Sequence, residues 1–347
     1  CRSCWFSVPF GDVGDVGDVV AVSAGGAVVA AALCVASRAG RLGGAGALTA
    51  PLDPAVDVAL PRAGHARTFI NILTGGTSGV YYPMGVAMSE IWAKGIPDAR
   101  TQVQATKASV ENLNLLQQGK GEAGFALGDS VQMAWEGNEE AGFKSKLDKL
   151  RAIGAIYPNY IQIVASKDSG IASLADLKGK SLSVGAAKSG TELNARAILE
   201  AAGMSYADLG KVEYLPFAES VELMKNRQLD ATLQSAGLGV ASLKDLATST
   251  PITVIPVPAD LVAKLGGAYH AATIPADTYD GQAADVPTAS VTNILVTHDG
   301  VPEETVYQMT KQLFENLDTL KAAHAAGNEL AFQALGGPRT IAGAAHG

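Results

Sequence analysis

The chain has few of the residues that build metal sites and disulfides. Its 3 cysteines, Cys1, Cys4 and Cys34, all lie near the start of its 347 residues, and its 5 histidines are scattered. A zinc site needs about four ligands, and Cys1 and Cys4 have no second pair to complete one. We therefore expect no metal site. Most of the chain needs neither disulfides nor thiols, which suits an oxidising compartment.

Charge is also scarce, and its balance is acidic. Charged residues make up 17% of the chain, and 34 acidic residues against 26 basic ones give a net charge of −8. Phosphate binding needs a basic face, so we expect no nucleic-acid partner. A small anionic ligand stays compatible with this charge, because a local pair of lysines can outweigh the global sign. An apolar fraction of 48% indicates a compact globular protein.

The motifs of nucleotide binding and acyl transfer are missing. Gly75–Gly79 lacks the lysine and spacing of a Walker loop, and Val80 stands where a G-x-S-x-G elbow needs its last glycine. Lys188–Gly190 is similar to the K-T-G element of penicillin-recognising enzymes, but no Ser-x-x-Lys accompanies it. We therefore expect a protein that is not an enzyme, with no catalytic residues and no cofactor.

The first 66 residues differ from the rest. A GDV triplet occurs three times between Gly11 and Val19, and an uncharged Ala/Gly/Val run follows as far as Ser37. The acidic start does not fit a secretory signal, although Gly64–Ala66 would serve as a signal-peptidase site. We expect residues 1–66 to be a leader, a disordered segment or a mis-called N-terminal segment. The mature protein is expected to be exported, to a periplasmic or other extracytoplasmic location.

From Thr68 onward, strand-like and helix-like runs alternate at short spacing, which predicts an α/β fold with largely parallel sheets. The expected strands are Thr68–Leu73, Thr101–Ala105, Ala123–Leu127, Arg151–Ile156, Ile161–Ala165, Ser181–Val184, Val212–Leu215, Ala231–Gln234, Ile252–Ile255 and Val291–Val296. The expected helices include Val80–Ala93, Val110–Gln118, Leu193–Ala202, Val221–Asn226 and Pro302–Ala325, with N-caps at Ser109, Asp129, Thr191 and Ser220.

Two segments predict where the chain crosses between two lobes. We expect it to leave lobe I near Ser166 and to return near Pro251, within the proline-flanked strand TPITVIP. Lobe I would then comprise 67–165 plus 251–335, lobe II 166–250, and the crossing strands would form a hinge. A Ser-Val-Glu sequence begins at Ser109 and another at Ser220. Each opens a predicted helix that is followed by an acidic residue, an alanine and a strand. Either the lobes share a structural unit or two ordinary βα units have converged.

Two loops rich in glycine and hydroxyls carry the functional signal: TGGTSGVYY at 74–82 and GAAKSGTELNAR at 185–196. Each follows a strand-like run and opens a helix, so backbone N–H groups and hydroxyls can donate to an anion or polar ligand. Lys107 and Lys188 lie beside helix starts, at the sheet edge where α/β proteins bind ligands. We expect a ligand with one or two carboxylates between the lobes. An ordinary tight turn is the alternative for the first loop.

Four segments, TGGTSGVYYPMG at 74–85, ATKASVENLNLL at 105–116, the run from Tyr157 to Leu199 and IPADTYDGQAADVPTASV at 274–291, carry a family resemblance. Together they resemble the TAXI family of solute-binding proteins, the binding subunits of tripartite ATP-independent periplasmic (TRAP) transporters. The resemblance implies a two-lobed, type II-like periplasmic-binding-protein fold with a ligand cleft between lobes joined by hinge strands. It also implies a small carboxylate ligand, of the glutamate, 2-oxoacid or dicarboxylate class, that is delivered to a TRAP membrane permease.

Carried over by motif, the resemblance implies a set of ligand-binding residues. These are Thr77, Ser78, Gly79, Tyr82 and Ser109 in the first lobe, Tyr157 at the hinge, and Ser189, Gly190, Thr191, Asn194 and Gln234 in the second, with Ser235 beside Gln234. Lys107 and Lys188 join them, and because family members commonly have small residues there, we expect a more anionic ligand. The tail at 336–347 lacks the family's usual ending.

Two other functions stay open at this point. The chain could be an extracytoplasmic sensor domain that signals to a membrane partner, or an enzyme on the same fold. We expect a monomeric transport receptor, and neighbouring genes for a permease or for a histidine kinase would separate transport from sensing.

Overall fold

The computed structural model describes residues 68–324 and 326, all of which belong to one compact unit, Pro61–Gly347. The expectations for residues 1–66 and for the tail at 336–347 lie outside the described residues. None of the described helices is long and apolar enough to cross a membrane.

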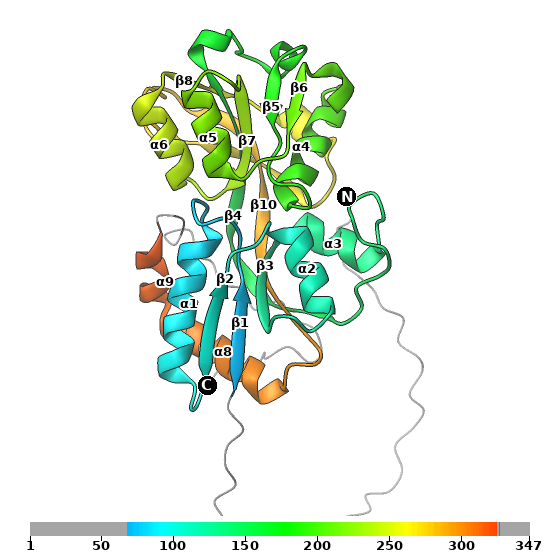
Figure 1. Ribbon diagram of the computed structural model, residues 1–347, viewed down its shortest axis with the longest axis vertical. Coiled ribbons are helices and arrows are strands. Elements are labelled where there is room, and N and C mark those ends of the chain that lie inside the picture. Colours follow the sequence, from blue (N-terminus) through cyan, green and yellow to red (C-terminus); the bar gives the residue numbers. More distant parts are fainter. Residues whose placement is uncertain (1–67, 325, 327–347) are drawn as a thin grey trace, which may run out of the picture. The chain divides into compact units, whose positions relative to one another are not determined.

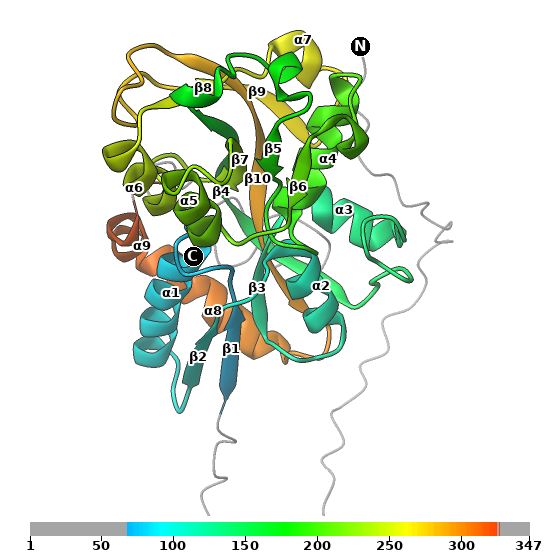
Figure 2. The ribbon, with the colours of Figure 1, turned by 45° about the horizontal axis from the view of Figure 1, so that its top comes forward.

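The described strands form one ten-stranded sheet flanked by helices (Figures 1 and 2). The strands are β1 (Phe69–Leu73), β2 (Arg100–Gln104), β3 (Ala123–Leu127), β4 (Leu150–Ser166), β5 (Ser181–Ser183), β6 (Lys211–Glu213), β7 (Ala231–Ala236), β8 (Ile252–Ile255), β9 (Tyr269–Ile274) and β10 (Val286–His298). The α-helices are α1 (Tyr81–Gly95), α2 (Ser109–Gln117), α3 (Gly128–Glu136), α4 (Gly190–Ala201), α5 (Phe217–Lys225), α6 (Ala241–Ser249), α7 (Ala259–Val262), α8 (Glu303–Glu315) and α9 (Leu317–Ala323). Short 3₁₀ turns occupy Lys167–Ser169, Leu174–Leu177 and Tyr206–Asp208.

The sheet contains two parallel groups of strands joined by two long antiparallel strands. Its order is β2-β1-β3-β10-β4-β7-β5-β6, with β8 beside β4 and β9 beside β10. Strands β1, β2 and β3 are parallel, as are β5, β6 and β7, whereas β4 and β10 are antiparallel to every partner. We call β1–β3 with α1–α3 the first lobe and β5–β7 with α4–α6 the second lobe. The prediction of a two-lobed α/β fold is confirmed in its architecture.

A β-bulge interrupts the pairing of the two long strands. Thr292 of β10 pairs with Pro158 and Ile294 pairs with Ala155, so two residues of β4, Ile156 and Tyr157, oppose Asn293 alone. The sequence predicted two separate strands here, Arg151–Ile156 and Ile161–Ala165. A bulge accommodates proline inside a strand, so β4 continues through Pro158 as one 17-residue strand.

Residues after Pro251, where the sequence predicted a return to lobe I, pair and pack with elements around the second lobe. Ile252 of β8 pairs with Ser166 at the end of β4, and Leu261 and Tyr269 lie in the same hydrophobic cluster as Leu182 of β5. Strand β9, which the sequence prediction missed, pairs with the first half of β10. We therefore propose that the chain returns to the first lobe within β10, rather than at Pro251.

Helix starts differ from the predicted N-caps. The N-cap positions are Ala108 for α2, Leu127 for α3, Ser189 for α4 and Pro216 for α5, instead of Ser109, Asp129, Thr191 and Ser220. Of these four, Ser189 caps with its side chain, because its Oγ accepts a hydrogen bond from the Glu192 N–H at 3.1 Å. Ser109 instead accepts from the Leu127 N–H at 3.1 Å, which ties the start of α2 to the end of β3.

Candidate functional site

A cavity of about 120 Å³ lies where loops of the two lobes meet. Its lining residues are Gly75, Gly76, Gly79, Val80, Tyr81, Thr106, Lys107, Ala108, Ser109, Leu127, Tyr157, Asn159, Ala186, Ser189, Gly190, Thr191, Pro216, Phe217, Ser235 and Ala236. A cavity of about 150 Å³ holds benzene, so this one suits a solute of roughly six non-hydrogen atoms.

The N-terminal ends of four helices surround this cavity. Tyr81 begins α1, Ser109 begins α2, Gly190 begins α4 and Phe217 begins α5, and all four residues line the cavity. The first N–H groups of a helix have no acceptor within that helix, and its dipole places partial positive charge at that end. The arrangement therefore favours a bound anion.

The helix starts face one another in pairs across the lobes. A Cβ atom on Gly190 of α4 would lie 2.5 Å from Ser109 Oγ and 2.8 Å from Leu127 Cδ1. On the other side, a Cβ on Gly79, before α1, would lie 3.8 Å from the Phe217 ring of α5. The second-lobe loop thus approaches the first lobe so closely at Gly190 that a larger side chain has no room.

Unusual backbone conformations shape the second predicted loop and the turn before α2. Gly185 has φ of 88°, and a Cβ there would lie 2.6 Å from Thr191 Cγ2, so this turn after β5 requires glycine. Ala108 has φ of 68°, which is rare for a residue with a Cβ. Its N–H donates to Thr106 Oγ1 at 2.9 Å, and its carbonyl accepts from the Asn112 N–H at 3.0 Å. These bonds hold a strained turn directly before α2.

Tyr157 contributes a buried hydroxyl without a partner. The residue lines the cavity and is 2% exposed, and its hydroxyl has no hydrogen-bond partner among the described residues. Burial raises the pKa of this phenol well above its usual value, so the group remains a neutral donor. A buried hydroxyl without a partner costs free energy, and a ligand oxygen in the cavity would satisfy it.

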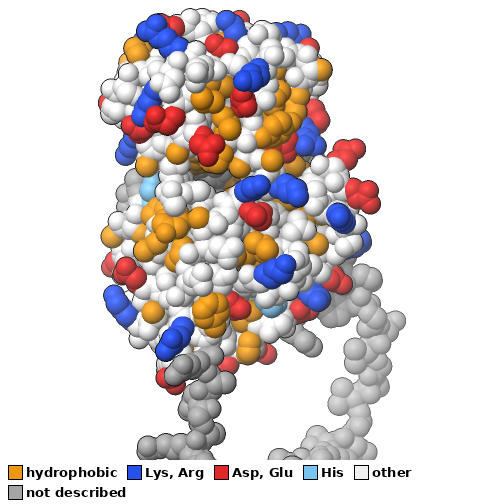
Figure 3. Space-filling view, in the orientation of Figure 1, with side chains coloured by type: hydrophobic (Ala, Val, Ile, Leu, Met, Phe, Trp, Pro, Cys, Tyr) orange, Lys and Arg blue, Asp and Glu red, His pale blue; other side chains and the backbone are white. Residues whose placement is uncertain are grey.

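Only one charged side chain, that of Lys107, is found among the described residues that line the cavity. Lys107 is exposed, and its backbone N–H donates to Glu111 Oε2 at 2.6 Å. On the molecular face drawn in Figure 3, basic and acidic side chains are interspersed. Positive potential at the cavity therefore comes from the helix starts together with this single lysine.

A buried carboxyl group lies behind the cavity. Asp129 of α3 is 2% exposed and accepts hydrogen bonds from Asn194 Nδ2 of α4 and the Tyr269 hydroxyl of β9, each at 2.7 Å, and from the Ser130 N–H at 2.6 Å. Desolvation by burial raises the pKa of Asp129, while these donors act to lower it. The network links a first-lobe helix to the second lobe.

Seven of the predicted site residues lie along the cavity: Gly79, Lys107, Ser109, Tyr157, Ser189, Gly190 and Thr191. The other six are not part of its lining: Thr77, Ser78, Tyr82, Lys188, Asn194 and Gln234.

Local geometry explains why one residue lines the cavity while the next residue of the same strand or helix does not. Along β7 successive side chains alternate between faces, so Ser235 lines the cavity, whereas Gln234 is buried and accepts from the Ser242 hydroxyl at 2.6 Å. Tyr81 faces the cavity and stacks on Phe125, with ring centroids 4.9 Å apart. Tyr82 is the next residue of α1 and does not line the cavity.

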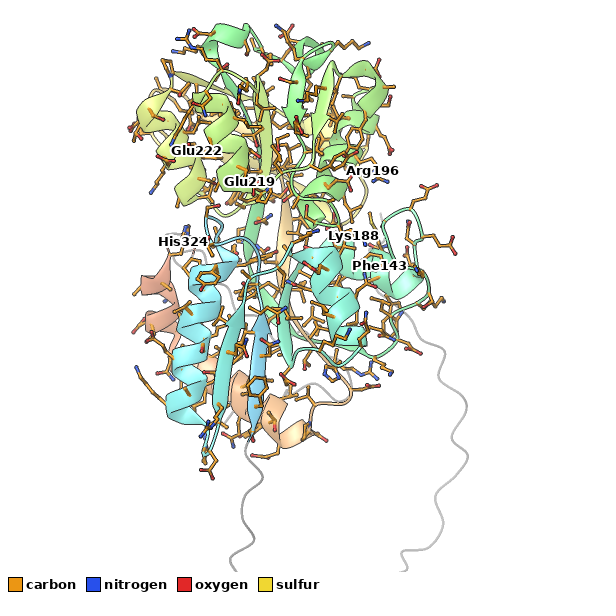
Figure 4. All side chains as sticks on the ribbon, viewed as in Figure 1. Phe143, Lys188, Arg196, Glu219, Glu222 and His324 are labelled. Carbon is orange, nitrogen blue, oxygen red and sulfur yellow. The ribbon has the colours of Figure 1, made fainter. Side chains whose placement is uncertain are left out.

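Lys188 lies outside the cavity lining. It is exposed, and Figure 4 shows it where the loop before α4 approaches α2. Its φ of 64° places it in the left-handed region, two residues before the start of α4. Of the two lysines that the sequence grouped together, Lys107 therefore lines the cavity and Lys188 does not.

Sequence reasoning missed several lining residues, above all Tyr81, Asn159 and Phe217. The segment EYLPFAES around Phe217 follows a strand and opens a helix, as the two predicted loops do, but it has no glycine. Its position before a helix was the available signal. Asn159 lies within β4, and no signal in the sequence singles it out. Within residues 68–324, no group of three His, Cys, Asp or Glu side chains could hold a metal ion.

Residues 72–338 match the model of the NMT1-like family. The chain belongs to the NMT1-like family. Solved structures show the same fold at low sequence identity. PhnD1 from Prochlorococcus marinus (MIT 9301), in complex with methylphosphonate, is 13% identical, with a TM-score of 0.53 over 78% of this chain and 93% of that chain. The periplasmic binding protein BugD is 11% identical, with a TM-score of 0.53 over 77% of this chain and 89% of that one. The NMT1-like chain thus has the fold of the two-lobed periplasmic binding proteins.

Proposed function

We propose that this NMT1-like protein is an extracytoplasmic solute receptor that binds a small carboxylate and delivers it to a TRAP membrane permease. The observation that supports binding is the cavity at which four helix N-termini meet. The four TAXI-like segments support the TRAP partner, and three of them supply residues of the cavity lining. We expect no turnover of the ligand, because the described lining contains no histidine or carboxylate to activate its serine hydroxyls.

The cavity favours a compact solute within the carboxylate class. Its volume of about 120 Å³ matches a three- or four-carbon 2-substituted acid better than a larger dicarboxylate. Hydroxyls and N–H groups would hold the carboxylate oxygens, and the rings of Tyr81 and Phe217 would cover the carbon atoms.

Thermal unfolding of the purified chain tests the proposal. Lactate, pyruvate, alanine, glutamate and succinate are compared with methylphosphonate and methanesulfonate. A ligand at about 100 times its Kd stabilises the folded state by about 2.7 kcal/mol, which raises the Tm by roughly 5–10 °C. We expect that rise for at least one carboxylate. A rise with methylphosphonate or methanesulfonate and with no carboxylate would refute the proposed ligand class.

Replacing each lysine separately tests the charge of the site. We expect Lys107→Met to weaken carboxylate binding about 3- to 10-fold, because an exposed cation contributes roughly 1 kcal/mol or somewhat more and is screened by salt. Lys188→Met should change affinity less than twofold, because this lysine lies outside the cavity. Calorimetry at low and high salt measures both. A larger loss for Lys188→Met than for Lys107→Met would show that the ligand lies elsewhere.

A further inference from the structure

Ser235 presents an acceptor to the cavity because its proton is used elsewhere. It lines the cavity from β7, and its hydroxyl donates to Asn194 Oδ1 at 2.7 Å. A serine hydroxyl has one proton and two lone pairs. Once the proton points to Asn194, the oxygen can offer only lone pairs to a bound solute.

The buried carboxylate of Asp129 fixes this direction. Asn194 directs Nδ2 to Asp129 Oδ2 at 2.7 Å and to the Tyr269 hydroxyl at 3.0 Å. The two ends of an asparagine amide are assigned from their hydrogen-bond partners. The Tyr269 hydroxyl uses its one proton on Asp129 Oδ2, so both of these oxygens accept from the Asn194 side chain. The amide NH₂ of Asn194 therefore faces Asp129 and Tyr269, and its amide oxygen faces Ser235.

Two other serines of the cavity, Ser109 and Ser189, have hydroxyl oxygens that accept a hydrogen bond from a backbone N–H. Ser109 Oγ accepts from the Leu127 N–H, and Ser189 Oγ accepts from the Glu192 N–H, each at 3.1 Å. The proton of Ser189 is therefore available to a ligand oxygen, whereas the Ser109 hydroxyl also forms a hydrogen bond with the Tyr81 side chain. The cavity thus combines a hydroxyl donor at the start of α4 with a hydroxyl acceptor at Ser235.

We infer that the relay Asp129–Asn194–Ser235 selects carboxylates that carry a hydrogen-bond donor near the carboxylate, namely 2-hydroxy or 2-amino acids, over the corresponding 2-oxo acids. In a cavity of about 120 Å³, the donor lies within a few bonds of the carboxylate. A hydroxyl or ammonium would donate to Ser235 Oγ. A 2-oxo group would place its lone pairs against those of Ser235. This inference rests on the proposed function and names the solute class more narrowly.

Calorimetry with acids that differ only at carbon 2 tests the selection. Each enantiomer of lactate, and alanine, is compared with pyruvate, and each enantiomer of 2-hydroxybutyrate with 2-oxobutyrate. In the wild-type chain we expect the hydroxy or amino acid to bind at least about 10-fold more tightly than its oxo counterpart, because an unpaired or repelled polar group is costly in a closed site.

Asp129→Asn should reverse this preference. The amide at position 129 can donate, so Asn194 can turn over and donate to Ser235, whose proton then faces the ligand. We expect the oxo acid to become the tighter ligand of each pair. Ser235→Ala should reduce the preference to within about threefold and does not depend on how Asp129→Asn folds. Asp285→Asn is the matched control, since this exposed carboxylate accepts from the Ala276 N–H outside the cavity.

The outcomes distinguish failure of the relay from failure of the proposed carboxylate receptor. Equal binding of hydroxy and oxo acids by the wild-type chain, or unchanged preference in Ser235→Ala, overturns the relay and leaves the carboxylate receptor standing. Absence of binding by every carboxylate tested, glutamate and succinate included, overturns the receptor and the relay together.

Discussion

Replacing Gly190 with leucine is expected to weaken carboxylate binding by at least about 100-fold. A Cβ atom at this position would lie 2.5 Å from Ser109 Oγ and 2.8 Å from Leu127 Cδ1, both in the first lobe. The remainder of a leucine side chain would therefore force the start of α4 away from the start of α2. A 100-fold loss corresponds to about 2.7 kcal/mol, within the usual cost of overpacking a tight contact.

The loss of affinity in Gly190→Leu should arise because the starts of α4 and α2 can no longer approach each other. The fold of each lobe should be unchanged. Ligand affinity falls in proportion to the fraction of molecules that can adopt the binding-competent state. Small-angle scattering should show that the ligand compacts the wild-type chain and leaves Gly190→Leu unchanged. Circular dichroism should match between the two.

Two further variants make this prediction decisive. Gly190→Ala places a single methyl in the same contact and should give a smaller loss. Gly267→Ala is the matched control, because a Cβ there meets nothing within 4 Å and Gly267 lies outside the cavity. If Gly190→Leu binds ligand as tightly as Gly267→Ala does, then α4 and α2 do not need to meet around the ligand.

Tyr157→Phe should weaken ligand binding about 10- to 150-fold while the ligand-free protein becomes more stable. Tyr157 lines the cavity, and its buried hydroxyl has no hydrogen-bond partner among the described residues. A hydrogen bond to a charged ligand is worth about 1.5–3 kcal/mol, and that bond is lost in phenylalanine. Removing an unsatisfied buried hydroxyl should raise the free energy of unfolding of the ligand-free protein by about 1 kcal/mol.

A decrease in ligand affinity together with an increase in the free energy of unfolding distinguishes a ligand-binding hydroxyl from one that serves only in packing. Tyr279→Phe is the matched control, because the buried hydroxyl of Tyr279 donates to Gln162 Oε1 and Tyr279 lies outside the cavity. Its removal should lower the free energy of unfolding by about 1–2 kcal/mol and leave affinity within twofold. Calorimetry and urea unfolding measure the two quantities. A Tyr157→Phe variant that is less stable and binds normally would contradict the assignment.

Much of the fold was predictable from local patterns. Apolar runs bounded by glycine and polar residues predicted most of the strands. The two glycine-rich loops indicated where a strand is connected to the start of a helix. The bulge at Tyr157 was not predictable, because it depends on Asn293 of a strand more than 130 residues later, as the separation of 136 residues in their hydrogen bond shows. Strand β9 was missed because its buried and exposed residues do not alternate regularly along the strand.

The candidate site was predictable by segment rather than by residue. Both predicted loops contribute to the cavity, yet the orientation of a helix decides between Tyr81 and Tyr82, and strand alternation decides between Gln234 and Ser235. Asn194 lies one turn into α4, where it contacts Ser235 without lining the cavity. Partners across the lobes determine such orientations, and no local pattern in the sequence contains them.

Strand β10 also determines the order in which the molecule can assemble during synthesis. It separates β3 from β4 in the sheet, although Val286–His298 is synthesised more than a hundred residues after Ala123–Leu127. Until β10 is added, β3 has an open edge, and the two parallel strand groups lack their shared centre. Pairing over such a sequence distance is slow. The sheet can therefore be completed only after residue 298 has been made, so most of the chain is synthesised before its central pairing can form.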